Sequence, residues 1–221
     1  MNKFDHIIFD LDGTLCDSIP DIHTSINFSL AQMNLPAVSE HQVRKAVGPG
    51  PDVFSRIILG EDNLTRFDEF RDIFRPHYID SCTNESKPFD GIVALLDQLT
   101  EYKLSVATNK GRTVTHMMLK DLGLLPYFDF IATRDCVEKP KPEPDMIFHI
   151  CSELNVSPER SLFIGDTDND ILAASRAGVF SCVALWGYSN HFDELTKIAD
   201  FTAASPKECL NIIKETAYAE E

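Results

Sequence analysis

Residues 6–18 constrain the fold of this chain more than any other stretch. A short apolar run, residues 7–9, is followed by Asp10 and Asp12 and then by Gly13. The run predicts a buried strand, and a glycine after it allows a sharp turn. Because ligands of open α/β sheets bind outside the carboxyl ends of the strands, the two aspartates lie where a site is expected. An ordinary strand with an Asp-Gly turn has the same pattern, so the interpretation depends on the rest of the chain.

Carboxylates at a strand end suit two kinds of chemistry. A pair of them can hold a hard cation through oxygen ligands. One carboxylate can also act as a nucleophile, since aspartate forms aspartyl-phosphate intermediates in some enzymes. Both possibilities require further polar groups at the same edge of the sheet.

The order of predicted helices and strands indicates an α/β fold interrupted by helices. Residues 18–82 hold apolar side chains at helical spacing and no strand pattern, with helices predicted at about 19–33, 40–47, 53–59 and 64–79. Strands are predicted at 7–9, 104–108, 128–133, 162–164 and 179–185, and further helices at 89–99, 112–121, 143–154, 168–177 and 206–218. This alternation is typical of parallel strands joined by crossover helices. We therefore expect a doubly wound, Rossmann-like parallel sheet (residues 1–16 and 84–221) with an all-helical insertion (residues 17–83).

The charge of the chain argues against a broad anionic partner. Its 221 residues include 35 acidic and 20 basic ones, a net charge of -15. Nucleic acids and anionic membranes bind to extended basic faces, whereas a small anionic substrate needs only a few local cations. There is no apolar run of the ~20 residues of a membrane span, no N-terminal signal pattern and no paired-cysteine motif. We expect a cytoplasmic protein without nucleic-acid or membrane partners, either a monomer or a homodimer.

Three further strand ends carry polar groups that suit phosphate or metal. Thr108 and Asn109 follow the second predicted strand and precede a helix, an arrangement that suits a phosphate. Lys141 stands in a proline-rich loop before a helix, where a fixed cation would stabilise phosphoryl charge. The segment after the fourth strand holds three acids that would repel one another without a cation or a lysine among them: Asp166, Asp168 and Asp170.

Each of these segments also has an ordinary explanation, as a helix cap or a solvated turn. Their combination is more specific than any one of them. A nucleophile, a metal site and fixed positive charge at one sheet edge are the parts that phosphoryl transfer requires.

The four stretches, taken in order, resemble the four motifs of the haloacid dehalogenase-like phosphohydrolase superfamily. They are Asp10-x-Asp12-Gly13-Thr14, Thr108-Asn109, Lys141 and Gly165-Asp166-Thr167-Asp168-Asn169-Asp170. Lys139 competes with Lys141 for the third motif, but Lys141 matches the family's lysine-proline-x-proline pattern. The resemblance implies a site assembled from almost the whole chain.

The resemblance also implies roles for these residues. Asp10 would be the nucleophile and Asp12 the general acid and base. Phosphate would be bound by Gly13, Thr14, Thr108, Asn109 and Lys141. Mg²⁺ would be held by Asp10, Asp166 and the backbone carbonyl of Asp12, with Asp170 in support.

The position of the insertion is similar to that of the C1 cap, a small helical domain that covers the site in one subclass of this superfamily. Within it the chain looks most like the phosphoglycolate phosphatases, on marks shared with pyrophosphatases, nucleotidases and β-phosphoglucomutases: Asp17-Ser18, the Val47–Gly50 turn and Pro88-Phe89-Asp90-Gly91. Asp12 argues against dehalogenase chemistry, because the metal-free dehalogenases have tyrosine there. Arg44, Lys45 and the turn at residues 48–51 are candidates for meeting a substrate carboxylate, or are solvated helix charges and a helix break.

The expected function is a Mg²⁺-dependent phosphatase that hydrolyses a small phosphorylated metabolite. Two alternatives from other classes remain open. A receiver-type signalling module also has a doubly wound sheet and clustered aspartates, but the long helical insertion argues against it. An inactive scaffold that binds a partner is the second, and four intact motifs argue against it.

Overall fold

The computed structural model describes residues 3–48 and 51–215, and the chain divides into two compact units. One consists of Met1–Cys16 with Pro88–Glu221, and the other of Asp17–Lys87. Residues 84–87, expected in the first unit, group with the second. The buried carboxylate of Asp21, in the first turn of the helical unit, accepts hydrogen bonds from the backbone N–H groups of Glu85 and Ser86 at 2.8–3.1 Å. These bonds tie the end of the insertion to its beginning.

A six-stranded parallel sheet forms the first unit and confirms the predicted doubly wound fold. Its order is β5-β4-β1-β6-β7-β8, with β1 His6–Phe9, β4 Lys103–Thr108, β5 Phe130–Thr133, β6 Ser161–Gly165, β7 Phe180–Ala184 and β8 Phe201–Ala203. On β1, Phe9 pairs with Val106 of β4 and with Ile164 of β6. The carboxyl ends of β1, β4 and β6 therefore lie next to one another, and Asp10 follows the central strand.

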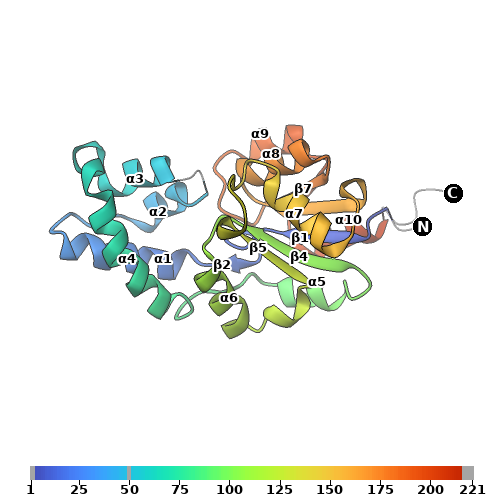
Figure 1. Cartoon of the computed structure of the whole chain (residues 1–221), viewed down its shortest axis with the longest axis horizontal. Coiled ribbons are helices and arrows are strands. Elements are labelled where there is room, and N and C mark those ends of the chain that lie inside the picture. The colour runs from blue at the N-terminus through green and yellow to red at the C-terminus, as the bar shows by residue number, and fades with distance from the viewer. Residues whose placement is uncertain (1–2, 49–50, 216–221) are drawn as a thin grey trace. The chain divides into compact units, whose positions relative to one another are not determined.

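Helices cover both faces of this sheet. Figure 1 shows α5 (Ile92–Asp97) and α6 (Arg112–Asp121) on one side, and α7 (Asp145–Leu154) and α8 (Asp168–Ala177) on the other. Buried apolar residues of β1, β4, β5 and β6 pack against α7 and α8, among them Ile8, Phe163, Ile147 and Ile150. Short 3₁₀ turns lie at Leu125–Tyr127, Arg134–Cys136 and Pro158–Arg160.

Two elements near the C-terminus were missed by the sequence patterns: strand β8 and helix α9 (Phe192–Ile198). Both are short, and β8 is an edge strand of three residues, too few to show an alternating pattern. The last helix, α10, spans Pro206–Glu215, and the remainder of its predicted range, residues 216–218, lies outside the described residues.

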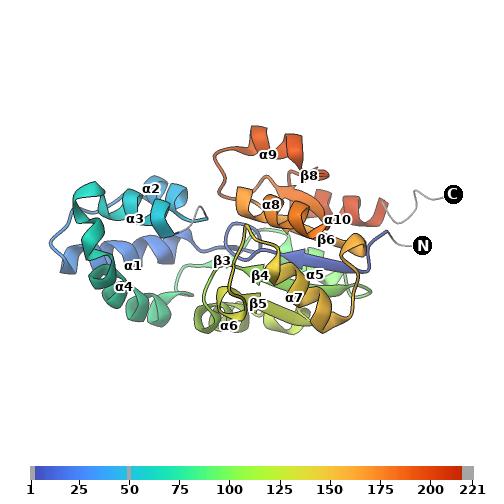
Figure 2. The same cartoon turned by 45° about the horizontal axis from the view of Figure 1, so that its top comes forward.

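The second unit is helical, as predicted. It contains α1 (Ile19–Gln32), α2 (Glu40–Ala46), α3 (Pro51–Leu59), the 3₁₀ helix Glu61–Arg66 and α4 (Phe67–Ser81). Ser39 and Gln42 form the predicted capping box at the start of α2. Figure 2 shows α1 and α4 side by side, with α2 and α3 next to them. Residues 49 and 50 of the predicted turn lie outside the described residues.

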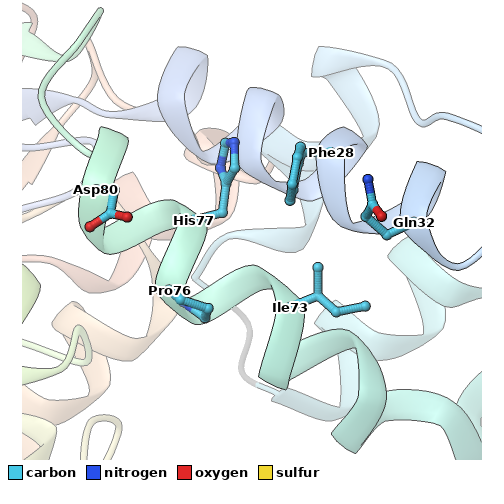
Figure 3. Close-up of a pocket in the computed structure, with 6 residues that line it drawn as sticks. All are labelled: Phe28, Gln32, Ile73, Pro76, His77 and Asp80. Atoms are coloured by element: carbon cyan, nitrogen blue, oxygen red, sulfur yellow. The ribbon is translucent and has the colours of Figure 1, made fainter.

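A two-stranded ribbon, β2 (Cys16–Asp17) with β3 (Lys87–Pro88), lies where the chain passes between the units. The helical unit also carries an open groove of about 530 Å³ between α1 and α4 (Figure 3). Its lining contains a stacked pair, Phe28 and His77, with ring centroids 4.0 Å apart. In the described part of the chain, no helix combines the length and the apolarity needed to cross a membrane.

Candidate active site

Asp10 lies at the centre of the candidate site, directly after β1. Its backbone N–H donates to the carbonyl oxygen of Ile164 at 3.0 Å, which fixes it against the neighbouring strand. Its side chain is 10% exposed, and Oδ1 accepts a hydrogen bond from Lys141 Nζ at 2.8 Å. Burial raises the pKa of Asp10 to about 7 against the opposing effect of the Lys141 ammonium group, and the nearby Asp170 raises it further.

Asp166 and Asp170 join Asp10 in a buried cluster of carboxylates. One oxygen of each of the three lies within 4.8 Å of the others. Asp166 accepts hydrogen bonds from Thr14 Oγ1 at 3.0 Å and from the backbone N–H of Tyr188 at 2.7 Å. Burial, together with the charges of Asp170 and Asp10, raises the pKa of Asp166 well above its usual range. The cluster therefore brings three acidic groups together in a buried site.

Asp170 has a structural partner as well as a place in this cluster. Its Oδ2 accepts hydrogen bonds from the backbone N–H of Thr167 at 2.9 Å and from Thr167 Oγ1 at 2.7 Å, which forms a capping box at the start of α8. The third acid of the same segment, Asp168, is exposed. Only Asp166 and Asp170 of the three acids therefore face the site.

Lys141 is the buried cation among these acids. Its side chain is 2% exposed, and its Nζ donates to Asp10 Oδ1 at 2.8 Å and to Asp170 Oδ1 at 2.6 Å. Burial alone would lower the pKa of Lys141, but Asp10 and Asp170 outweigh it and the pKa is raised, so the ammonium form persists. The competing Lys139 is exposed.

The loop after β4 supports Lys141 and brings a second lysine to the site. Asn109 Nδ2 donates to the backbone carbonyl of Lys141 at 2.8 Å, and Thr108 Oγ1 accepts from the backbone N–H of Lys110 at 3.1 Å. Asn109 Oδ1 is buried and has no hydrogen-bond partner among the described residues. Lys110 Nζ donates to both carboxylate oxygens of Asp12, at 2.9 and 2.8 Å. The side chain of Asp12 thus belongs to a separate ion pair.

Three glycines make room for the acids. A Cβ atom on Gly13 would lie 2.3 Å from Asp166 Oδ2, one on Gly187 would lie 2.2 Å from Asp166 Cβ, and one on Gly165 would lie 2.3 Å from Asp170 Cβ. Side chains at these positions would displace the carboxylates. The backbone therefore approaches Asp166 closely at two points and Asp170 at one.

This donor set fits a hard divalent cation. It offers carboxylate oxygens only, which such cations prefer. Burial, and after it the charges of the neighbouring carboxylates, raise the pKa values of Asp10 and Asp166, and a bound cation would offset both effects. Asp10 and Asp166 are the residues that would hold it, with Asp170 beside them.

The structure brings together the predicted residues of the core: Asp10, Thr14, Asn109, Lys141, Asp166 and Asp170 are linked by the contacts above. Thr14 and Asn109, expected to bind phosphate, use their side chains to hold Asp166 and Lys141. Sequence reasoning missed Lys110, Gly187 and Tyr188. Lys110 directly follows the predicted Thr108-Asn109 motif, whereas no local pattern marks Gly187 or Tyr188, which reach Asp166 only through the fold.

Comparison with known proteins agrees with this geometry. A model of the haloacid dehalogenase-like hydrolases matches residues 7–184, which is most of the chain. The chain belongs to the haloacid dehalogenase-like hydrolase family. One relative in it, the phosphoglycolate phosphatase of Aquifex aeolicus, is 34% identical over 94% of this chain and 95% of its own length. A phosphoglycolate phosphatase of Yersinia pseudotuberculosis is 34% identical over 83% of this chain and 82% of its own.

Solved structures of haloacid dehalogenase-like hydrolases have the same fold. A predicted phosphoglycolate phosphatase of Haemophilus somnus superposes with a TM-score of 0.87 at 30% identity, covering 96% of this chain and 99% of that one. A haloacid dehalogenase-like family protein of Streptococcus pneumoniae gives a TM-score of 0.84 at 29% identity, with the same coverage of both chains. The likeness covers both units of the chain rather than the sheet alone.

Proposed function

We propose that this protein is a Mg²⁺-dependent phosphatase that hydrolyses a small phosphomonoester through an aspartyl-phosphate on Asp10. The observation that carries the proposal is the setting of Asp10: a buried carboxylate at the end of the central strand, bonded to Lys141 and clustered with Asp166 and Asp170. A buried nucleophile that contacts an ammonium group and belongs to a carboxylate set able to bind a metal is equipped for attack on phosphorus.

Each side chain of the site then has a separate role in the reaction. Asp10 attacks phosphorus, and the bond to the leaving oxygen breaks as Asp12 gives that oxygen a proton. Water next attacks the phosphorus of the aspartyl-phosphate while Asp12 takes a proton from it, which restores Asp10 and releases phosphate. The Lys141 ammonium group stabilises the charge of the transferred phosphoryl group. Asp10 and Asp166 would hold Mg²⁺, whose positive charge would reduce the repulsion between the Asp10 carboxylate and the anionic phosphoryl group.

Phosphoglycolate is the proposed substrate. Support comes from the relatives named phosphoglycolate phosphatase, which match almost the full length of this chain. Asp12 also suits a phosphate ester of an alcohol such as glycolate, because the departing oxygen would leave as a poorly stabilised alkoxide unless it received a proton.

A substrate screen with two matched variants tests this proposal. The purified protein is assayed with Mg²⁺ on phosphoglycolate, pyrophosphate, nucleotides and hexose phosphates, and kcat/KM is compared. We expect phosphoglycolate to have the highest value. Asp10→Asn removes the nucleophile and should reduce kcat by roughly 10³-fold or more, whereas Asp168→Asn, the same change on an exposed residue, should retain activity.

The outcomes separate the alternatives. Full activity in Asp10→Asn would exclude Asp10 as the nucleophile. A higher kcat/KM for another phosphoester would overturn the substrate but not the reaction. A stable phosphoprotein without turnover would favour a signalling module.

A further inference from the structure

The pair formed by Lys110 and Asp12 differs from an ordinary surface ion pair. Lysine side chains at protein surfaces usually stay mobile in water, and their ion pairs contribute little to the stability of the fold. Here the side chains of Lys110 and Asp12 are only 9% and 14% exposed, and one ammonium group contacts both oxygens of one carboxylate. The side chain of Lys110 is therefore largely withdrawn from solvent, with its ammonium group held against the Asp12 carboxylate.

The backbone on both sides of this pair is fixed by hydrogen bonds. Next to Lys110, its own N–H donates to Thr108 Oγ1, and the carbonyl of Gly111 accepts from the backbone N–H and the Oγ1 of Thr115 at 3.1 and 3.0 Å. Next to Asp12, the N–H of Gly13 donates to the carbonyl of Cys16 at 3.0 Å. Because both loops are anchored, Lys110 can determine the direction of the Asp12 carboxyl group.

The two lysines of the site divide its acids between them. Lys141 binds Asp10 and Asp170, which belong to the metal-binding cluster, while Lys110 binds Asp12, whose side chain lies outside that cluster. This separation matters because Asp12 has a different task under the proposed function. It handles a proton, which a carboxylate engaged by a metal ion could not do.

The hydrogen-bonding capacity of lysine then selects one oxygen of Asp12. An ammonium group donates hydrogen bonds and cannot accept them. When Asp12 carries a proton, Lys110 can bind only the unprotonated oxygen, so the O–H group must lie on the other oxygen. After the proton has passed to the leaving oxygen, both oxygens are again acceptors, which is the arrangement in this structure.

We propose that Lys110 is a positioning residue that turns the protonated oxygen of Asp12 toward the leaving oxygen of the substrate. The inference rests on the proposed phosphatase function and deepens it: the residue acts on the step in which the P–O bond breaks and Asp12 transfers its proton to the departing alcohol. Lys110 itself does not exchange a proton in this step.

Leaving-group dependence distinguishes positioning from a merely structural role. The alcohol of phosphoglycolate needs a proton to depart, whereas p-nitrophenolate departs from p-nitrophenyl phosphate without one. We expect Lys110→Met to lower kcat/KM for phosphoglycolate by about 10–100-fold, a fraction of the full effect of a general acid. With p-nitrophenyl phosphate the loss should stay below about threefold. kcat/KM is the right quantity because it reports the steps through alcohol release.

Three further variants complete the experiment. Lys110→Arg keeps a charged donor and should restore much of the activity on phosphoglycolate. Lys120→Met makes the same change on an exposed residue of α6 and should leave both substrates unaffected. If Lys110→Met does not fold, as judged by thermal unfolding, Lys110→Gln is compared on the same two substrates.

Equal losses of kcat/KM on both substrates, or no loss on either, would overturn the role of Lys110 while leaving the phosphatase function intact. A wild-type protein that hydrolyses neither substrate would instead overturn the proposed function.

Discussion

Gly187 provides a direct test of how the acidic cluster is built, because it packs against Asp166 from a distant part of the chain. A Cβ atom added at Gly187 would lie 2.2 Å from Asp166 Cβ, 2.5 Å from Oδ2 and 2.6 Å from Cγ. The φ angle of Gly187 lies outside the left-handed region, so alanine is compatible with the backbone there. Gly187→Ala therefore changes one thing, the space that Asp166 occupies.

The size of the effect follows from these contacts. The clash involves the Cβ atom of Asp166 and not only the end of its side chain, so Asp166 or the loop must move. Overpacking of this kind typically costs about 1–3 kcal/mol. A shift would also disturb the hydrogen bonds that Asp166 accepts from Thr14 and from the backbone of Tyr188. Changes to groups that orient a metal ligand reduce metal affinity by about 10–100-fold.

Two measurements on the same protein check this prediction. Thermal unfolding without metal should give a Tm lower by roughly 2–12 °C, from about 2–4 °C for each kcal/mol in a chain of this size. Calorimetric titration with Mg²⁺ should give a Kd raised by about 10–100-fold. Gly111→Ala is the matched control, because its Cβ atom would lie 3.6 Å from Asp135 Oδ2, an ordinary contact, with φ at -72°.

Wild-type Mg²⁺ affinity in Gly187→Ala would refute the assignment of Asp166 as a residue whose position determines metal binding. An equal loss of Tm and Mg²⁺ affinity in Gly111→Ala would show that any added methyl group in these loops lowers both quantities. The close contact of Gly187 with Asp166 would then not be the cause.

Two more predictions concern stability. Burial lowers the pKa of His6 to about 4, against 6.5 in an unfolded chain. As the pH falls, the unfolded state therefore binds a proton before the folded state does. The contribution of His6 to the free energy of unfolding should be complete above pH 6.5 and should fall by about 3 kcal/mol as the pH drops to 4. Urea unfolding of wild type and His6→Gln at pH 7 and 4 should show a smaller loss in the variant, and equal losses would contradict the reasoning. Asp21→Ala should lower the free energy of unfolding by about 2–4 kcal/mol, because it leaves the buried N–H and hydroxyl of Ser86 without their acceptor. A loss under 1 kcal/mol in the same urea unfolding assay would show that water replaces the carboxylate.

The parts of the fold that local sequence patterns specify were predictable. The start of α2 follows from a capping box whose two members are three residues apart, and α8 lies between a similar box and Gly178, which ends it in the left-handed conformation. Strand β8 was not predictable in this way. Its three residues take their conformation from pairing with β7, from Phe201 opposite Cys182 to Ala203 opposite Ala184, and such pairing leaves no local pattern.

In the site, too, the residues could be predicted from local patterns but their contacts could not. Asp10, Lys141 and Asp166 could be predicted because each follows or approaches a strand end of a recognisable sheet. The contacts of these residues could not, since they join positions far apart in the chain. Lys110 reaches back 98 positions to Asp12, and Tyr188 meets Asp166 from 22 positions away. Sequence motifs cannot predict contacts between residues so far apart in the chain, and only the folded structure shows which lysine contacts which acid.

The charge balance of the site connects its two lysines with its metal requirement. Four carboxylates, those of Asp10, Asp12, Asp166 and Asp170, face two ammonium groups, so two negative charges remain if all the acids are ionised. Burial and the neighbouring negative charges together raise the pKa values of Asp10 and Asp166, the two acids that would hold a cation. One divalent ion would balance the site before a substrate arrives. The negative charge of the phosphoryl group would then enter a site with no net charge of its own, and removing Lys141, which contacts the nucleophile, should weaken substrate binding as well as the chemistry.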